Sequence, residues 1–275
     1  MTVTAQELAS GPGWRVVDVI CENGPHDRRF EEQHANVSIA AVTHGTFQYR
    51  TRQGSAVLVP GAVLLGNAGA CFECGHDHGH GDRCLAFHVT PEFLENVASG
   101  VAGARRSSFS VSSLPPLRQL MPMLADAEAA RDNRDSGAFE ELALRLAGAV
   151  TALLTQESRT VRQPHHRDEQ RISAAARRIE QHADEPLSLC DLARDAGLSP
   201  YHFLRTFRQV VGMTPHQFIL HTRLHRAAVR LRRTDDAISS VAYDAGFNDL
   251  STFNRRFRRL MGASPGVYRA RQSRA

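Results

Sequence analysis

The amino-acid sequence predicts an α+β protein with a β-rich N-terminal domain and an all-α C-terminal domain of two helix-turn-helix units. Two observations support this fold class. Short apolar runs separated by glycine and proline turns fill the N-terminal half, and a duplicated helical pattern occupies the C-terminal part. Between them, residues 157–168 (ESRTVRQPHHRD) are polar and include Pro164, so we expect domains at 1–156 and 169–275 joined by this linker.

Six short apolar segments in the N-terminal domain are candidate strands, at residues 14–20, 37–42, 46–52, 56–58, 62–65 and 85–89. Turn residues such as Gly45 and Gly54 separate them, which is typical of a small β-barrel or sandwich. Two amphipathic helices are expected to follow. Their apolar faces are marked by Leu117, Leu120, Met121 and Leu124, and by Leu142, Leu146, Val150 and Leu153.

The C-terminal part carries one pattern twice. The first copy contains Ala193, Gly197, Phe203, Phe207, Arg208, Gly212, Pro215 and Phe218, and the second contains Ala242, Gly246, Phe253, Phe257, Arg258, Gly262, Pro265 and Tyr268. The offset is 49 residues up to the first glycine and 50 from the first phenylalanine onward. In each copy the glycine can end a helix at positive φ, and the phenylalanines four apart face a core. Each copy therefore predicts a helix-turn-helix.

The second helix of each copy presents a set of side chains suited to reading DNA bases. The outward sets are Tyr201, His202, Leu204, Arg205 and Arg208 in the first copy, and Leu250, Ser251, Asn254, Arg255 and Arg258 in the second. Arginine can bond guanine bidentately, asparagine can do the same to adenine, and apolar groups can contact the thymine methyl. The alternative is a helical pair that packs on another protein. Two copies joined by one helix favour double-stranded DNA.

The charge distribution agrees with a nucleic-acid partner for the C-terminal part. Residues 1–160 hold 13 arginines and 18 acids, whereas residues 161–275 hold 20 arginines and 11 acids. A basic half suits phosphate binding. The chain contains no lysine, which excludes P-loop nucleotide hydrolases, protein kinases and pyridoxal enzymes, because each of these needs a lysine.

Residues 171–269 resemble the DNA-binding domain of the AraC/XylS family of bacterial transcription regulators. The matching stretches are LSLCDLARDAGLSPYHFLRTFRQVVGMTPHQFI and AISSVAYDAGFNDLSTFNRRFRRLMGASPGVYR. The resemblance implies seven helices, with a long helix between the two helix-turn-helix units. It places base contacts on Tyr201, Leu204 and Arg205, and on Leu250, Ser251, Asn254 and Arg255. Leu204 departs from the family, which often has a polar residue there.

The resemblance further implies a cupin-like β-barrel sensor domain at the N-terminus, followed by helices that often form a dimer interface. Packing of these helices against the barrel is the alternative. We expect a DNA-binding regulator, an activator rather than an enzyme, with RNA polymerase, a homodimer partner and a small-molecule effector as further partners. With no signal peptide and no apolar stretch near 18 residues, a cytoplasmic protein without membrane contact is expected.

Residues 71–88 concentrate three cysteines and four histidines in CFECGHDHGHGDRCLAFH. Thiolate together with imidazole suits Zn²⁺ or another thiophilic metal. In an extended chain Cys74, His76 and His78 share one face, and a hairpin permitted by Gly79 and Gly81 could return Cys84 to it. We therefore expect the metal ligands to be Cys74, His76, His78 and Cys84. Further candidates are Cys71, His80 and His88.

Three other interpretations of this cluster stay open. The histidines could form a polar loop, the cysteines could be small buried hydrophobes, or the thiols of Cys21, Cys71, Cys74 and Cys84 could form a redox switch. At the level of the whole protein, the alternatives are a cupin-type metalloenzyme with a DNA-binding tail and a reactive-cysteine DNA-repair methyl acceptor. The thiolate-rich composition favours a closed sensing site over an oxygenase centre, which keeps open positions and mostly histidine or carboxylate ligands.

Overall fold

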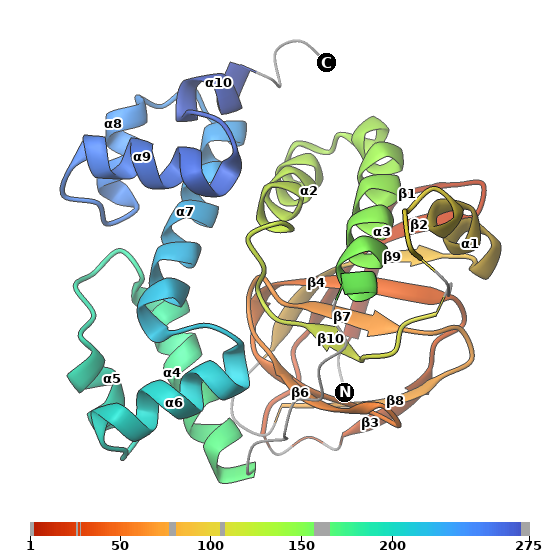
Figure 1. The fold of residues 1–275 in the computed structure, drawn as a ribbon, viewed down its shortest axis with the longest axis horizontal. Helices are drawn as coiled ribbons and strands as arrows, with labels where there is room; N and C mark the ends of the chain where they lie inside the picture. The colour runs from red at the N-terminus through yellow and green to blue at the C-terminus, as the bar shows by residue number, and fades with distance from the viewer. Residues whose placement is uncertain are drawn as a thin grey trace.

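We analysed a computed structural model that describes residues 3–25, 27, 29–76, 81–104, 108–156 and 166–270, without the side chains of residues 156, 166, 200 and 201. Two facing sheets make up the core of the N-terminal half (Figure 1). One is six-stranded, in the order β1 (Val3–Gly11), β2 (Trp14–Cys21), β9 (Asp82–Val89), β4 (Val37–Gly45), β7 (Val63–Gly66) and β10 (Ser113–Leu114). The other is four-stranded, in the order β3 (Phe30–Gln33), β8 (Cys71–Gly75), β5 (Phe47–Thr51) and β6 (Gly54–Leu58).

All six candidate strand segments lie in strands of these sheets, namely β2, β4, β5, β6, β7 and β9. Strands β1, β3, β8 and β10 and the helix α1 (Pro91–Ser99) were not expected. Strand β1 is largely exposed along its length, so its sequence lacks the apolar alternation that identifies a half-buried strand. The β-rich prediction is confirmed, while the assignment as a cupin barrel stays a prediction.

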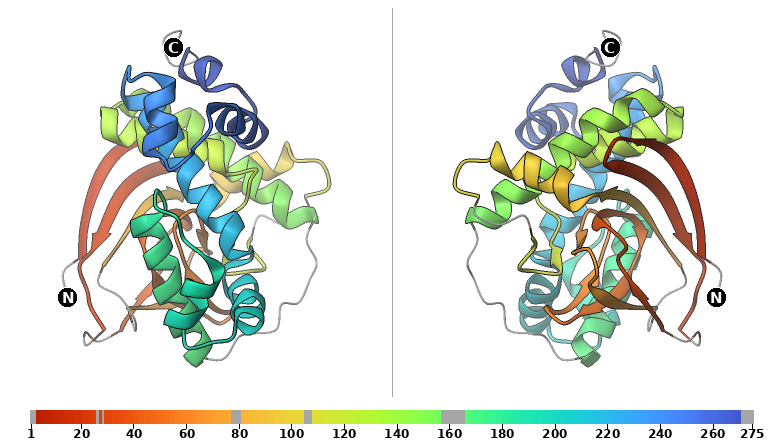
Figure 2. Two further views of the ribbon diagram at one scale, coloured as in Figure 1. Left: turned by 90° about the vertical axis from the view of Figure 1, so that its left-hand side faces the viewer. Right: turned by 90° about the vertical axis from the view of Figure 1, so that its right-hand side faces the viewer.

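The six-stranded sheet is buried on both faces at its central strands β9, β4 and β7. Its side chains alternate, so Ala40, Val42 and Cys84 face the four-stranded sheet, while Ile39, Leu85 and their neighbours face three helices. These helices are α1, α2 (Met121–Asn133) and α3 (Phe139–Gln156), with a 3₁₀ turn at Ser136–Ala138 before α3 (Figure 2). The two expected helices correspond to α2 and α3, and their apolar faces pack within the chain. Helix α2 begins only at Met121, so Leu117 and Leu120, which were expected in it, precede it.

Seven helices form the C-terminal half within residues 166–270, as the resemblance implies. They are α4 (His166–His182), α5 (Leu189–Asp195), α6 (Pro200–Val211), α7 (Pro215–Arg233), α8 (Ile238–Asp244), α9 (Leu250–Met261) and α10 (Pro265–Ala270). Helix α4 begins at His166, inside the segment expected to be a linker; residues 157–165 lie outside the described residues. None of the described helices is both long and apolar enough to span a membrane.

Local chemistry sets the boundaries of the two helix-turn-helix units, α5–α6 and α8–α9. Ser188 and Ser199 cap α5 and α6, and Asp249 caps α9, each by accepting a hydrogen bond from a backbone N–H of the first turn. Gly197 and Gly246 follow the first helix of each unit with φ of +61° and +84°, which confirms the positive-φ turn expected there. Phenylalanines 203, 207, 253 and 257 are fully buried.

The two halves are in contact at both ends of the long helix α7. One hydrophobic cluster runs from the space between the sheets into α4, α5 and α6, and another joins Met121 and Ala125 of α2 to the core of the second helix-turn-helix unit. Polar contacts accompany them. Arg177 of α4 donates to Thr46 Oγ1 at 2.8 Å, and Tyr268 of α10 donates to Asp126 Oδ1 at 2.9 Å. The N-terminal half therefore touches both helix-turn-helix units.

Candidate nucleic-acid interface and buried thiol–imidazole cluster

Helices α6 and α9 turn their expected base-reading side chains away from the core. His202, Arg205 and Arg208 on α6 are exposed, as are Ser251, Asn254, Arg255 and Arg258 on α9. Leu204 and Leu250 are half-buried, and the side chain of Tyr201 lies outside the described residues. The same helices bury phenylalanines on their opposite faces, so each is amphipathic with one face free for a ligand.

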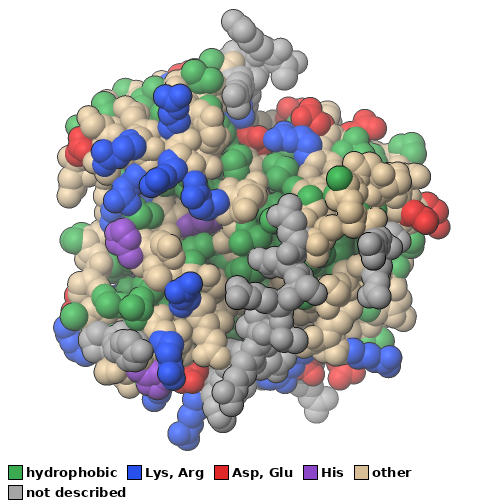
Figure 3. All heavy atoms as spheres, in the orientation of Figure 1, with side chains coloured by type: hydrophobic (Ala, Val, Ile, Leu, Met, Phe, Trp, Pro, Cys, Tyr) green, Lys and Arg blue, Asp and Glu red, His purple; other side chains and the backbone are tan. Residues whose placement is uncertain are grey.

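The arginines of these faces differ from several other arginines of the C-terminal half. Within the described residues, Arg205, Arg208, Arg255 and Arg258 form no salt bridge, whereas Arg194, Arg230, Arg232 and Arg233 each pair with a carboxylate. Arg223 of α7 instead donates hydrogen bonds to three backbone carbonyls. Two lie in the segment after α4, and the third is that of Gly246. Figure 3 shows arginine side chains gathered over the C-terminal helices on one face of the molecule. Helices α6 and α9 thus carry arginines that form no salt bridge among the described residues.

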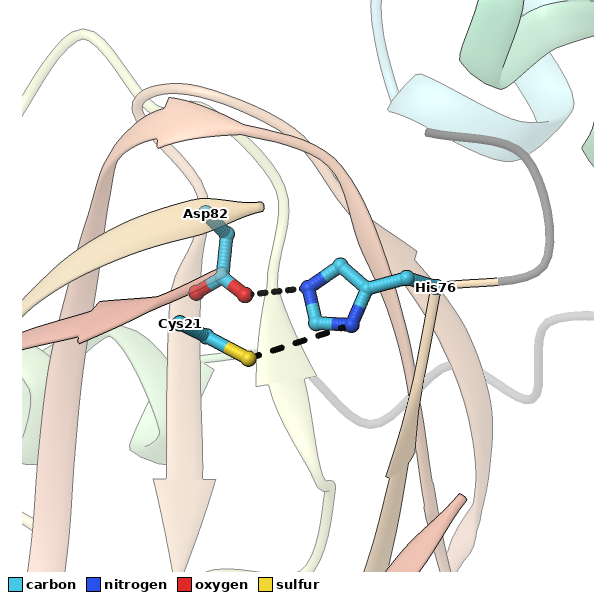
Figure 4. A group of neighbouring side chains, drawn as sticks. All are labelled: Cys21, His76 and Asp82. Atoms are coloured by element: carbon cyan, nitrogen blue, oxygen red, sulfur yellow. Dashed lines mark hydrogen bonds and ion pairs between the residues drawn. The ribbon is translucent and has the colours of Figure 1, made fainter. Parts of the chain in front are cut away.

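A second group of functional side chains lies inside the N-terminal half, at one end of the six-stranded sheet. Cys21 at the end of β2 is directly opposite Asp82 at the start of β9, so their side chains share one face of the sheet. Cys84 follows two residues later on β9 and lies on the same face. His76 follows β8 in the opposite sheet and reaches across to this group (Figure 4).

These side chains meet within short distances. His76 Nε2 lies 2.5 Å from Asp82 Oδ1, and Cys21 Sγ lies 4.0 Å from His76 Nδ1. Cys21, His76 and Asp82 each offer one possible metal-ligand atom, and these three atoms all lie within 4.8 Å of one another. The Cys84 thiol donates a hydrogen bond to Asp82 Oδ2, with 3.3 Å between sulfur and oxygen. The side chains of His76 and Asp82 are only 2% and 7% exposed, so the cluster is closed to bulk water.

Burial and neighbouring charge perturb several of these groups. Burial, with Asp82 and the other thiols nearby, raises the pKa of Cys74 and of Cys84 well above the ordinary value. Burial lowers the pKa of His76, but the hydrogen bonds and charges of Asp82 and Cys21 outweigh it and raise this pKa to about 9. The Cys74 and Cys84 thiols are therefore kept protonated, and the raised pKa favours the protonated imidazole of His76.

The structure brings together only part of the predicted ligand set. Cys74 lies on the four-stranded sheet and Cys84 on the six-stranded sheet, so β8 and β9 do not form the expected hairpin. Cys71 is exposed, and His88 lies at the far end of β9, where it interacts with His34. His78 and His80 lie outside the described residues. The expected ligand set does not include Cys21 and Asp82; the two-residue spacing of Asp82 and Cys84 is the one local signal that would have placed Asp82 and Cys84 on one face.

A cavity of about 500 Å³ lies between the two halves, among β4, α2, α4 and α7. His221 of α7 is buried in its wall, stacked with His225 at 6.5 Å between ring centroids. His221 Nε2 and Arg131 Nη1 are buried without a hydrogen-bond partner among the described residues. His225 Nε2 forms a hydrogen bond with Glu128 Oε1 of α2 at 2.5 Å, so the two halves are in direct contact at this wall of the cavity.

Comparison with known proteins finds a family match in the C-terminal half. A family model described as a helix-turn-helix domain matches residues 192–271. Regulatory protein SoxS of Salmonella typhimurium is 39% identical over 93 residues, which cover 34% of this chain and 87% of that protein.

Two solved structures of DNA-binding domains are similar to the same region. An AraC-type transcriptional regulator from Chromobacterium violaceum is 29% identical over 38% of this chain and 92% of its own, with a TM-score of 0.36. The DNA-binding domain of AdpA, solved in complex with a target DNA, is 30% identical over 38% of this chain and 94% of its own, also with a TM-score of 0.36. Most of SoxS is matched at 39% identity, and the motifs of both helix-turn-helix units are present. The chain belongs to the AraC/XylS family of transcription regulators.

Proposed function

We propose that this protein is a sequence-specific regulator that reads double-stranded DNA with α6 and α9 in successive major grooves. Its N-terminal half senses a ligand, a metal or an oxidant and passes the signal to the DNA-binding half. The protein acts as an activator that contacts RNA polymerase, and it works as a homodimer. The cavity between the halves is where a small effector would touch both of them at once.

The observation that carries this proposal is the absence of salt bridges at Arg205, Arg208, Arg255 and Arg258 within the described residues. A guanidinium with a carboxylate partner is already satisfied, whereas these four are exposed on the helix faces that enter a groove in helix-turn-helix proteins.

Replacing Arg205 or Arg255 by alanine should weaken binding to a selected DNA site by about 1–3 kcal/mol each, because a bidentate contact to a base is lost. Binding to random DNA should change little. The affinities can be measured by titration of duplexes selected from a random pool. Arg194→Ala is the matched control: it removes the same charge from the same half, but Arg194 is engaged with Asp191 at 2.6 Å. Equal losses on selected and random DNA would show that the two arginines bind phosphate instead.

One protomer should protect about two helical turns of DNA, because the two recognition helices lie on one face of the duplex about 34 Å apart. Hydroxyl-radical footprinting of the selected duplex, at a protein concentration where one protomer binds, measures the length of the protected region. Protection of a single turn would mean that only one of the two units enters a groove.

A further inference from the structure

We propose that Cys21, His76 and Asp82, completed by Cys84, form a binding site for one thiophilic divalent cation of the Zn²⁺ class. The site lies between the two sheets, at the end of the six-stranded sheet nearest the DNA-binding half. The site itself stands on the geometry of the N-terminal half alone. Its role in regulating DNA binding rests on the proposed function.

The fold rather than the local sequence assembles this site. Cys21 and Asp82 are cross-strand partners in the antiparallel pair of β2 and β9, and Cys84 is the next residue on the same face of β9. His76 enters from the opposite sheet, two residues beyond Cys74. The donors therefore come from both sheets and from positions up to 63 residues apart in the chain. Such convergence of four ionisable side chains in a sheet interior is not needed for packing, where apolar residues would serve.

The donor set fits a tetrahedral thiophilic ion. Two sulfurs, an imidazole nitrogen and a carboxylate oxygen are all ligands that Zn²⁺ accepts, whereas Mg²⁺ and Ca²⁺ prefer oxygen alone. Metal–ligand bonds of ~2.0–2.3 Å separate tetrahedral ligand atoms by roughly 3.3–3.8 Å. The ligand atoms of Cys21, His76 and Asp82 lie within 4.8 Å of one another, so these three side chains need only small movements to close on an ion. Cys84 Sγ lies 3.3 Å from Asp82 Oδ2 and can complete the set. The ion takes the place of one His76 ring proton and of the thiol protons, which leave to solvent.

The surroundings of the site are those of a closed structural or sensing centre. The side chain of His76 is 2% exposed and its ring packs against the ring of Phe47, with centroids 6.1 Å apart. Cys74 approaches from the other sheet and interacts electrostatically with Cys21, Asp82 and Cys84, so it is an alternative fourth ligand. Four protein ligands leave no open position for a substrate, as in structural zinc sites.

The site is connected to the DNA-binding half through the turn between β4 and β5. Gly45 at the end of β4 is paired with Asp82, and a side chain at Gly45 would collide with the backbone of residues 81 and 82. The N–H of Gly45 donates to the Glu180 carboxylate of α4, and Arg177 of α4 donates to Thr46. Movement of Asp82 on metal binding is thus passed through one backbone pair to the first helix of the DNA-binding half.

The test uses the full chain, purified without a histidine tag and reconstituted anaerobically with Zn²⁺ or Co²⁺. We expect one ion per chain and a thiolate-to-Co²⁺ charge-transfer band. Cys21→Ser, His76→Gln and Asp82→Asn should each lower metal affinity about tenfold or more. Cys71→Ser and Cys190→Ser are matched controls, because both replace exposed cysteines, and they should leave affinity and spectrum unchanged. In case a variant does not fold, alkylation of the buried thiols is also measured on the unaltered chain. Added Zn²⁺ should protect these thiols from the alkylating reagent.

Two results would overturn the site. The first is a reconstituted chain that binds no ion, or whose Co²⁺ spectrum lacks sulfur coordination. The second is equal loss of metal in the Cys71 and Cys190 controls, which would indicate adventitious binding on the surface. A chain without metal in which mild oxidant removes two buried thiols reversibly would identify a redox switch instead. The effect of Zn²⁺ on DNA affinity is measured separately, so a metal site without an effect on DNA would refute only its regulatory role.

Discussion

Gly246→Ala should destabilise the protein by about 3 kcal/mol or more, whereas Gly197→Ala, at the equivalent turn of the first unit, should cost only about 1–2 kcal/mol. Both glycines have positive φ, so each substitution imposes the strain of a left-handed backbone. The difference lies in the space around them. A Cβ at Gly246 would lie 2.5 Å from the carbonyl oxygen of Asp184, whereas a Cβ at Gly197 meets nothing within 4 Å.

The collision at Gly246 involves backbone atoms, which cannot rotate away as a side chain can. The same turn is held by Arg223, which donates to the Gly246 carbonyl at 2.7 Å and to carbonyls in the segment after α4. Displacing the turn therefore also disturbs the contact between α4 and the second helix-turn-helix unit. Urea unfolding of the two variants measures the free energies of unfolding. Equal losses of unfolding free energy in the two variants would contradict this expectation. They would show that the segment around Asp184 moves aside at little cost and that only the left-handed backbone strain destabilises the protein.

Lowering the pH should reduce the free energy of unfolding because of His221, and His221→Leu should remove much of this dependence on pH. Burial, together with the neighbouring His225, lowers the pKa of His221 from 6.5 to about 3. The unfolded chain therefore takes up a proton below pH 6.5 that the folded chain takes up only near pH 3. Stability is lost as the pH falls through this window, by about 1.4 kcal/mol per pH unit. At pH 4.5 the loss from this residue should reach roughly 2–3 kcal/mol.

The charged groups around His221 decide whether this expectation holds. His225 lies on the same helix, and the cavity beside His221 is also lined by Glu128 and Arg131 of α2, Glu180 of α4 and Arg83 of β9. Urea unfolding at pH 7 and pH 4.5 gives the acid-induced loss for the parent and for His221→Leu. The difference between them isolates His221 from other buried histidines such as His34. His216→Leu, at an exposed position of the same helix, is the control and should keep the parent's acid sensitivity. A parent and a His221→Leu variant that lose equal stability would disprove the assignment.

The sequence predicted the recognition helices well because their signals are local. Each unit shows its cap, its turn glycine and its phenylalanines within about 25 residues, and repetition removes the ambiguity of a single copy. The six apolar strands were predictable for the same reason. Strand β1 and strand β8 were not, because exposed or functional residues break the alternation that identifies a strand.

The ligand cluster could be predicted only in part, since it depends on strand pairing across the chain. The spacing of Cys74 and His76 places this pair on one face of an extended chain. The side-chain bonds of His76, however, go to Asp82 and Cys21, neither of which was among the expected ligands. Nothing near Cys21 in the sequence indicates that β2 pairs with β9 in the register that brings it to Asp82. The two sheets also separate β8 from β9, which a local hairpin prediction cannot foresee.

The hydrophobic cluster shared by the two sheets and by α4, α5 and α6 has a consequence for biosynthesis. The strands that supply its N-terminal part leave the ribosome long before α4 has been made, because Val42 and Ile172 are separated by 130 residues. Until then the apolar face around β6 is uncovered, which is a condition that promotes aggregation of nascent chains. Completion of the DNA-binding half is thus also the step that covers this face, and truncated chains that end before α4 should bind holdase chaperones.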